Sequence, residues 1–276
     1  MRSNGEAEAR QPLTEQELVQ HLVTTRLSGR VATSVQNSIG NAHRLLAGDA
    51  DYTFGLSDWR DATYDEVVMA VGKLGATWEA EDGADTPTHP ALIDPQGTLD
   101  GITRHRDTLR TFLEGGGGRA LVCTGHPYGL LAHYSVIADA LARSGCELLR
   151  PLAGRRDVVR RPDGRPCQIG YPHGVGALAV GGGLHHTHRS HYMEAMLEEV
   201  GGAEGVDLVV ADHGFAGTAI EAGIPTLSIA DVNDPALPLA QARGRTDGVL
   251  LIDDGLEPMV FVPVTDAIVA DIVRGR

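Results

Sequence analysis

The residues best suited to chemistry lie in the segment from Gly205 to Pro235, GVDLVVADHGFAGTAIEAGIPTLSIADVNDP. Its two short apolar runs, DLVVA and TLSIA, predict strands buried on both faces of a parallel sheet, and the residues between them predict a helix. The first strand is followed by Asp212 and His213, and the second by Asp231. In open α/β sheets ligands bind beyond the carboxyl ends of the strands, so these side chains are candidates for a functional site.

A purely structural role for the same aspartates is the alternative. Aspartate often forms turns and caps helices, and either Asp212 or Asp231 alone could do no more than that. A DH pair at one strand end and a DVND run at the next favour a functional site over two separate caps.

A second strand, turn and helix precede this segment. The strand ALVC, residues 120–123, stops at the run TGHPYG and is followed by a predicted helix over residues 130–144. This arrangement points free N–H groups and a positive helix end at an anion, although it matches neither a Walker A loop nor GxGxxG. Thr124, Gly125, Gly129 and Gly214 are therefore predicted to bind substrate. His126, at the strand end, is predicted to be functional rather than only bonded to the turn.

The densest histidine cluster, LHHTHRSH, follows a predicted strand at residues 177–180 and three glycines. Histidines this close can bind a metal only if their rings converge, and no carboxylate or cysteine accompanies them at a familiar zinc spacing. Placement in a loop at a strand end still favours a role at the site for at least one of His185, His186 and His188.

The order of elements predicts an α/β fold with a Rossmann-like, mostly parallel sheet flanked by helices. Residues 1–11 are predicted to be disordered, residues 12–97 to form a helical N-terminal subdomain, and residues 98–276 to form the α/β catalytic domain of one composite globular unit. A strong turn signal at Pro162 to Arg165 predicts a β-hairpin insertion that could overhang the site. Its arginines could bind phosphate or simply form a solvated charged surface.

One polar helix face is a further candidate. Asn37, Asn41 and Arg44 share one side of a helix predicted over residues 34–47, by their spacing of four and three. Such a face is usually only solvated, but Asn41 is retained as a candidate substrate-binding residue.

Composition limits the class of partner. The 276 residues carry a net charge of −14, which argues against nucleic-acid binding through a broad basic surface. Three cysteines form no CxxC pair, which fits a reducing cytoplasm, and no apolar run approaches membrane-spanning length. We therefore expect a cytoplasmic protein that acts on a small-molecule phosphate ester, without a nucleic-acid or membrane partner, and leave open a homo-oligomer.

Several of these motifs also carry a family resemblance. At TGHPYGLL, GGGLHHTH and ADHGFAGTAIEAGIPTLSIADVNDP the sequence resembles a family of bacterial, mostly actinobacterial, proteins described simply as phosphatases. The similarity continues through DADYTFGLSDW near the front and PVTDAIV near the end, so it covers most of the chain. The resemblance implies phosphatase activity and leaves the roles of individual residues to physical argument.

Hydrolysis of a phosphomonoester needs an anion cradle, neutralisation of the phosphoryl charge, a nucleophile and a leaving-group acid. The leading hypothesis gives Asp212, Asp231 and Asp234 a divalent ion, with Mg²⁺ preferred because hard cations bind carboxylate oxygens. His126 or His213 would act as general acid or base, and Asn233 would orient water or the ion.

A second version gives the metal to His185, His188 and Asp212, and would favour Zn²⁺ or Mn²⁺ because imidazole is the softer ligand. A phosphohistidine route stays open, although the sequence has neither the Arg-His-Gly run of histidine phosphatases nor the DxDx[TV] motif of the haloacid dehalogenase type.

Two other classes of function also stay open. The run GTAIEAGIP loosely resembles the turn and helix of glycosyltransferases and sugar-nucleotide epimerases, which would make the chain a sugar-nucleotide enzyme. A non-catalytic phosphometabolite-binding protein would hold the same ligand without turnover.

Overall fold

The computed structural model describes residues 12–78, 88–156 and 158–274. The predicted disorder of residues 1–11 lies outside these described residues. The α-helices are α1 Glu15–Thr25, α2 Val35–Leu46, α3 Tyr64–Lys73, α4 Pro95–Glu114, α5 Pro127–Arg143, α6 His191–Glu199, α7 His213–Glu221, α8 Ala236–Ala242 and α9 Val262–Arg274. The strands are β1 Gly29–Ser34, β2 Ala76–Thr77, β3 Pro90–Ile93, β4 Arg119–Thr124, β5 Glu147–Leu148, β6 Val159–Arg160, β7 Pro166–Gly170, β8 Gly176–Val180, β9 Gly183–Leu184, β10 Leu208–Asp212, β11 Thr226–Ala230 and β12 Val249–Leu251.

The main sheet has the order β12-β11-β10-β4-β8-β7-β6. From β12 to β8 each strand is parallel to the next in this order. Beyond β8 the sheet continues in the antiparallel pairs β8–β7 and β7–β6. The chain leaves β4 toward β5 and β8 on one side and returns to β10 on the other side. The strand order therefore reverses between β4 and β10, and their carboxyl ends form the crevice in which α/β proteins bind ligands.

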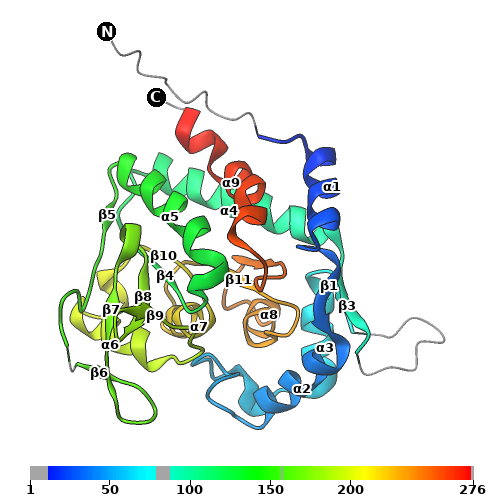
Figure 1. Ribbon diagram of the computed structural model, residues 1–276, viewed down its shortest axis with the longest axis horizontal. Coiled ribbons are helices and arrows are strands. Elements are labelled where there is room, and N and C mark those ends of the chain that lie inside the picture. The colour runs from blue at the N-terminus through cyan, green and yellow to red at the C-terminus, as the bar shows by residue number, and fades with distance from the viewer. Residues whose placement is uncertain (1–11, 79–87, 157, 275–276) are drawn as a thin grey trace.

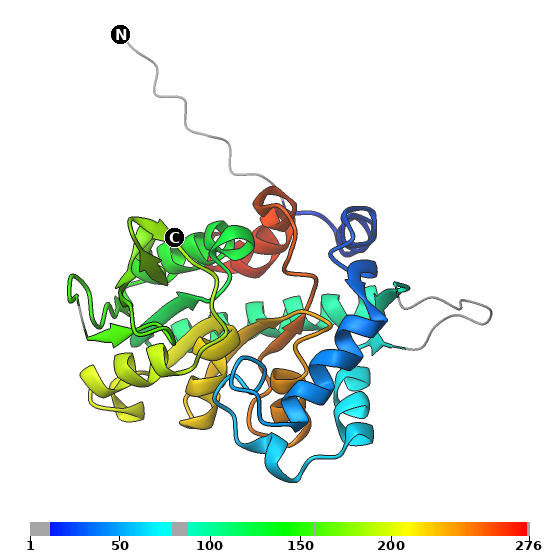
Figure 2. The ribbon, with the colours of Figure 1, turned by 60° about the horizontal axis from the view of Figure 1, so that its bottom comes forward.

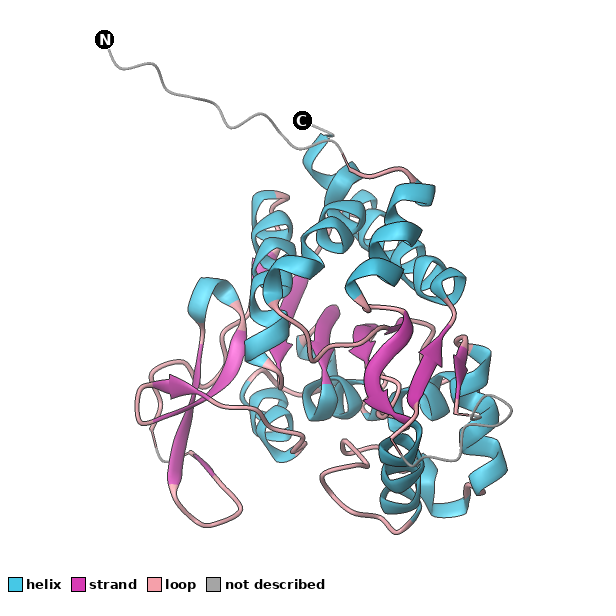
Figure 3. Cartoon of the chain, turned by 45° about the vertical axis from the view of Figure 1, so that its right-hand side comes forward, coloured by secondary structure: helices cyan, strands magenta, loops and turns pink. Residues whose placement is uncertain are grey.

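Helices cover both faces of the sheet, as Figure 3 shows. Strand residues alternate between two buried clusters: Leu208 and Val210 pack with α4, α5 and α9, whereas Val209 and Ala211 pack with α6, α7 and α8. This alternation follows from the two-residue period of a strand. The fold is thus the α/β arrangement that the sequence predicts, with apolar strands buried on both faces.

The N-terminal segment is not wholly helical, in contrast to the prediction. Besides α1, α2 and α3 it contains a three-stranded antiparallel sheet of order β1-β3-β2. These strands are short and belong to a separate sheet, so they lack the long apolar runs that mark the central strands. The segment shares the core of the main sheet, because α3 packs against α8 and α1 against α4 (Figure 2).

The turn predicted at Pro162 to Arg165 joins β6 to β7, whose paired residues include Val159 and Cys167. Strand β7 in turn pairs with β8, so the two strands extend one edge of the main sheet (Figure 1). Among the described helices none is long and apolar enough to cross a membrane.

Two histidines are fully buried between the helices on one face of the sheet. His105 donates from Nε2 to the carbonyl of Gly248 at 2.8 Å, and Nδ1 of His133 donates to the Thr265 hydroxyl at 2.7 Å. The other ring nitrogen of each has no hydrogen-bond partner. Burial lowers the pKa of His105 to about 4 and that of His133 to about 3, so both rings are neutral in the folded protein at pH 7.

These histidines predict a loss of stability in mild acid. An unfolded chain binds protons at histidine near pH 6.5, whereas the folded protein binds them at His105 and His133 only near pH 4 and 3. As the pH is lowered from about 6.5 to 4, the free energy of unfolding should therefore decrease, by up to about 1.4 kcal/mol per pH unit for each ring. Urea unfolding at pH 7, 6 and 5 measures the slope. His105→Gln, which cannot take up a proton, should reduce it, and an unchanged slope would contradict the prediction.

Candidate active site

The turn between β4 and α5 is bound to the end of β10 by one buried carboxylate. Asp212 accepts hydrogen bonds from the Thr124 hydroxyl at 2.6 Å, from the Gly125 N–H at 2.6 Å and from Nδ1 of His213 at 2.8 Å. The Asp212 side chain is fully buried. A carboxylate with three donors has its lone pairs largely occupied, so Asp212 positions its neighbours rather than acting as an open ligand.

His213 is held in an unusual backbone conformation. It begins α7 directly after β10 and has φ +46°, in the left-handed region that costs a residue with a side chain on the order of 1 to 3 kcal/mol. Its Nδ1–H donates to Asp212, so the proton of a neutral ring lies on Nδ1, and Nε2 is on the side of the ring away from Asp212. That Nε2 atom lies 3.5 Å from Oδ2 of Asp234 and 3.8 Å from Oδ2 of Asp254.

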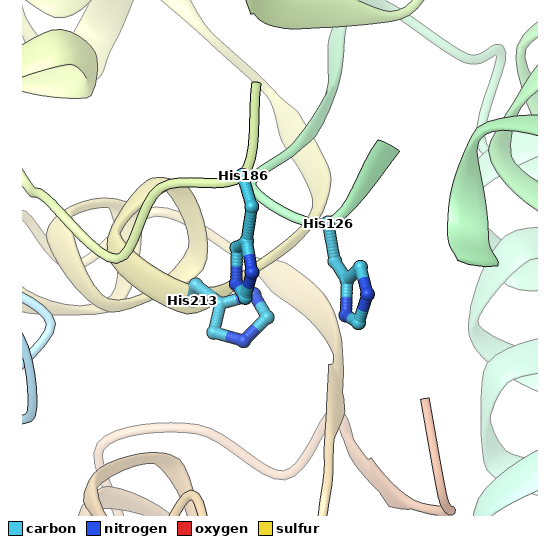
Figure 4. A group of neighbouring side chains, drawn as sticks. All are labelled: His126, His186 and His213. Atoms are coloured by element: carbon cyan, nitrogen blue, oxygen red, sulfur yellow. The ribbon is translucent and has the colours of Figure 1, made fainter. Parts of the chain in front are cut away.

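Two further histidines, His126 and His186, complete the group, and Figure 4 shows their side chains beside that of His213. His126 caps α5, and His186 comes from the loop after β9 and is exposed to solvent. Their rings stack with centroids 4.6 Å apart, and the His186 and His213 ring centroids are 5.2 Å apart. We call His126, His186, His213, Asp234 and Asp254 the histidine–carboxylate cluster.

The members of this cluster lie at metal-ligand spacing. One ligand atom each from His126, His186 and His213 lies within 4.8 Å of the others, and so does one each from His213, Asp234 and Asp254. Nδ1 of His126 and Oδ2 of Asp254 are 3.3 Å apart, yet both are buried and neither has a hydrogen-bond partner. Unpartnered buried groups of this kind mark a place where a cation or other ligand fits.

Burial and neighbouring charges shift the pKa values of three members of the cluster, His213, Asp234 and Asp254. Burial disfavours a charged His213, but Asp234, Asp212 and Asp254 outweigh it and raise its pKa to about 10. Burial raises the pKa of Asp234 to about 6, although His213 works against this rise. Burial likewise opposes ionisation of Asp254, yet His126 and His213 bring its pKa below the usual range. The surrounding carboxylates thus stabilise a positive charge on His213.

The predicted metal set of Asp212, Asp231 and Asp234 does not come together among the described residues. Only Asp234 reaches the cluster. Asp231 instead accepts from the Thr33 hydroxyl at 2.7 Å and from the N–H of Val232 at 2.7 Å. The carboxylate oxygens of Asp212 and Asp231 thus accept hydrogen bonds from protein groups.

The second predicted set, His185, His188 and Asp212, is also separated. Nε2 of His185 donates to the carbonyl of Val180 at 3.2 Å, away from the cluster. His188 stacks on His213 with ring centroids 4.6 Å apart, but its Nδ1 donates to the carbonyl of Asp51 at 2.7 Å. Of the three candidates in the histidine run, His186 is the one that lies at ligand spacing.

The predicted substrate-binding asparagines connect two parts of the chain. The side-chain N–H₂ of Asn41 donates to the carbonyl of Asn233 at 3.0 Å, and that of Asn233 donates to Oδ1 of Asn37 at 2.6 Å. These contacts join α2 to the loop after β11. The described contacts of both side chains are therefore with protein groups.

The glycines at the site permit close approach of other backbone. A Cβ at Gly125 would lie 2.4 Å from the carbonyl oxygen of Thr187, one at Gly214 2.4 Å from that of His188, and one at Gly129 2.4 Å from that of Asp254. The sequence predicts that the turn at Gly214 binds a phosphate, but backbone atoms of His188 and Arg189 occupy the space beside Gly214. The approaches at Gly125 and Gly214 bring the turns that carry His126 and His213 against the histidine run, and the approach at Gly129 brings α5 against the segment after β12.

A cavity of about 320 Å³ adjoins the cluster. Its lining residues come from the loop after α2, the turn between β6 and β7, strand β8, the histidine run and the start of α6: Asp51, Arg161, Pro162, Leu178, His185, His186, Thr187, His188, Arg189 and Tyr192. A larger cavity of about 730 Å³ lies along α4, near Asp207 and Pro225 at the amino ends of β10 and β11. That cavity contains no histidine and lies at the sheet edge where ligands are not expected, so the smaller one is the candidate binding site.

Asp254 is the cluster member that the sequence analysis did not propose. Asp254 lies shortly after the end of β12, whereas Asp212 is the last residue of β10, and in both cases an aspartate comes at the end of a short apolar run. Asp253 accepts from the N–H groups of Ala32 and Gly255, both at 3.0 Å. Only the folded structure distinguishes the aspartate that faces the cluster from the one that binds backbone.

Fold and site together define an α/β protein whose histidines and aspartates gather at the carboxyl edge of parallel strands, beside a small cavity that contains arginines. The chain belongs to the family described as Phosphatase, whose model matches residues 13–276. It is 36% identical over 260 residues to Phosphatase SCO2771 of Streptomyces coelicolor, covering 90% of this chain and 92% of that relative. No solved structure matches the chain. The resemblance found in the sequence is thereby confirmed, and family and relative both support phosphatase activity.

The packing at Gly125 gives a direct test of how the site is assembled. Gly125→Ala would place a methyl group against the Thr187 carbonyl and displace the histidine run from β4, so we expect a loss of about 1 to 3 kcal/mol in the free energy of unfolding. Phosphatase activity should fall with it. Gly40→Ala is the control, because nothing lies within 4 Å of its added methyl group inside α2, and it should preserve or raise stability. Equal melting temperatures for the two variants would show that the close approach is unimportant.

Proposed function

We propose that the protein is a metal-assisted phosphatase that hydrolyses the phosphomonoester of a small metabolite. The proposal rests mainly on one observation: Nε2 of His213, Nδ1 of His126 and the carboxylates of Asp234 and Asp254 face one another in a buried space. Family membership supplies the reaction class, and the cluster supplies the means of performing it.

A cation fits this arrangement on simple electrostatic grounds. With its Nδ1 proton held by Asp212, a neutral His213 presents a lone pair to two carboxylate oxygens, an arrangement that repels itself unless a positive charge lies between them. A proton on Nε2 is one solution, and a divalent metal ion is the other. The ion pair between His126 Nδ1 and Asp254 Oδ2, 3.3 Å apart and without good hydrogen-bond geometry, favours the metal, because an ion between the two buried atoms would satisfy both.

The donor set indicates which metal. Three imidazoles and two carboxylates provide borderline nitrogen ligands together with hard oxygen ligands. Such a mixture suits Zn²⁺ or Mn²⁺ better than Mg²⁺, which prefers oxygen ligands and retains several waters. We therefore place Mn²⁺ or Zn²⁺ ahead of the Mg²⁺ that the aspartates alone suggest.

The residues around the ion have distinct tasks. A divalent ion held here supplies Lewis-acid stabilisation of the charge that develops on the phosphoryl oxygens. Asp212 orients His213 and strengthens it as a ligand through the hydrogen bond to Nδ1. The helix α5 begins at Pro127, directly after His126, so its positive N-terminal end adjoins the cluster and favours an anion. His186 is exposed and borders the cavity through which an ester can approach.

The size of the cavity supports a small substrate. A volume of about 320 Å³ is at the lower end for small-molecule sites and suits a sugar, nucleoside or amino-alcohol phosphate.

Phosphate release from a panel of sugar and nucleoside monophosphates tests the function. We expect chelator-treated protein to be inactive and Mn²⁺ or Zn²⁺ to restore release more effectively than Mg²⁺. His126→Ala and Asp254→Asn should each lower kcat/KM by about 100-fold or more and reduce the metal bound per chain. His43→Gln, an exposed change on α2, is the control and should behave as the parent protein. Failure of every ester with every metal would contradict the proposal and favour transfer or ligand sensing instead.

The orienting role of Asp212 has its own test. Asp212→Asn keeps the size of the side chain but removes the charge that holds Nδ1–H of His213, so metal affinity should fall about 10- to 100-fold. Calorimetric titration with Mn²⁺ or Zn²⁺ measures this fall, and excess metal should restore part of the activity. An unchanged affinity would show that Asp212 does not act through His213.

A further inference from the structure

The cavity beside the cluster touches the proposed metal site at one place only. Of the described residues that line it, His186 alone belongs to the histidine–carboxylate cluster. Its other walls are formed by Arg161 and Pro162, by Leu178 and Tyr192, and by the neighbouring loops. A substrate whose phosphate reaches the cluster would therefore place the rest of its structure in this cavity.

The cavity is positively charged in a strongly acidic protein. Arg161 and Arg189 line it together with a single carboxylate, Asp51, whereas the whole chain carries a net charge of −14. A local positive charge of this kind attracts an anion and rejects a cation. The occupant is thus expected to carry negative charge away from the phosphate that is bound at the cluster.

The two arginines differ in how fully they are engaged. Arg189 makes a two-pronged ion pair with Asp51, with Nε–Oδ1 at 2.5 Å and Nη2–Oδ2 at 2.8 Å. Arg161 lies 3.5 Å from Oδ2 of Asp163, and Arg165 holds the same oxygen more closely at 2.6 Å. A guanidinium has five N–H donors, so Arg161 retains donors for a ligand while Arg189 stabilises the wall.

The turn that carries Arg161 is fixed against the site. Arg161 N–H donates to the carbonyl of Arg165 at 2.9 Å, and its own carbonyl accepts from Gly164 at 2.8 Å. One residue earlier, the carbonyl of Arg160 accepts from Nε2 of His191 at the start of α6, at 2.9 Å. The backbone of Arg161 is therefore positioned by the hairpin and by the helix that follows the histidine run.

We propose that Arg161 is a specificity residue that binds a second anionic group of the substrate, so that the preferred substrate is a small phosphate ester with a further carboxylate or phosphate. This inference rests on the proposed phosphatase function. The guanidinium binds carboxylate and phosphate alike through paired hydrogen bonds. It touches the part of the substrate that is not transferred, so it should govern binding more than turnover.

Two matched pairs of substrates test this assignment: glycerate 3-phosphate with glycerol 3-phosphate, and fructose 1,6-bisphosphate with fructose 6-phosphate. The parent enzyme should have a higher kcat/KM for the member with the second anion in at least one pair, and the pair identifies the anion. In Arg161→Ala the KM for that member should rise roughly 10- to 100-fold with kcat little changed, while the other member is unaffected. Arg156→Ala removes a positive charge near the same hairpin but on a different cavity, and should change neither value.

Binding without turnover provides a second measurement. Calorimetry with phosphonoacetate and methylphosphonate, which resist hydrolysis, should show that Arg161→Ala weakens only the former. Equal kcat/KM within both pairs of the parent enzyme would overturn the inference and leave the phosphatase function standing. A loss of kcat for all esters in Arg161→Ala, or the same effect in Arg156→Ala, would also overturn it. Absence of phosphate release from every ester would instead contradict the proposed function itself.

Discussion

The buried carboxylate of Asp212 is the interaction on which the site depends. It gathers three donors from two strand ends: the Thr124 hydroxyl and Gly125 N–H after β4, and the ring of His213 after β10. A buried carboxylate is costly unless its oxygens are satisfied, so this set of bonds fixes the two turns against each other. The same bonds set the tautomer of His213 and therefore decide which ring nitrogen faces the cluster.

Around that interaction the fold concentrates charge that it does not neutralise internally. Asp234 and Asp254 face His213, and the unpartnered atoms of His126 and Asp254 lie beside them. Buried polar groups are usually paired in folded proteins, and outside the cluster one ring nitrogen each of His105 and His133 is among the exceptions. Structures tolerate unsatisfied and strained groups mainly where a ligand compensates for them, and the left-handed backbone of His213 belongs to the same pattern.

The N-terminal segment contributes support rather than cluster residues. Thr33 and Ala32, in β1, bind Asp231 and Asp253 after β11 and β12. The loop after α2 places Asp51 against Arg189 and His188, which forms one wall of the cavity. The N-terminal segment thus contacts loops from the second half of the chain at the carboxyl edge of the sheet. It supports the site as well as the core.

The sequence by itself determined the central strands and the edge at which the polar residues gather. Short apolar runs and the residues after them, such as TLSIA followed by Asp231, carry this information because burial of a parallel strand requires it. The capping box that Thr14 and Glu17 form at the start of α1 likewise depends only on residues close together in the chain. The small sheet of the N-terminal segment escaped prediction because its strands are short and its pairing joins residues distant in the chain. Only the tertiary structure decided which polar groups face one another: that Asp254 joins the cluster, that Asp212 and Asp231 bind protein groups, and that His186 rather than His185 or His188 reaches ligand spacing. Ring orientation and hydrogen-bond partners depend on packing between segments far apart in the chain, and residue type and spacing do not encode them.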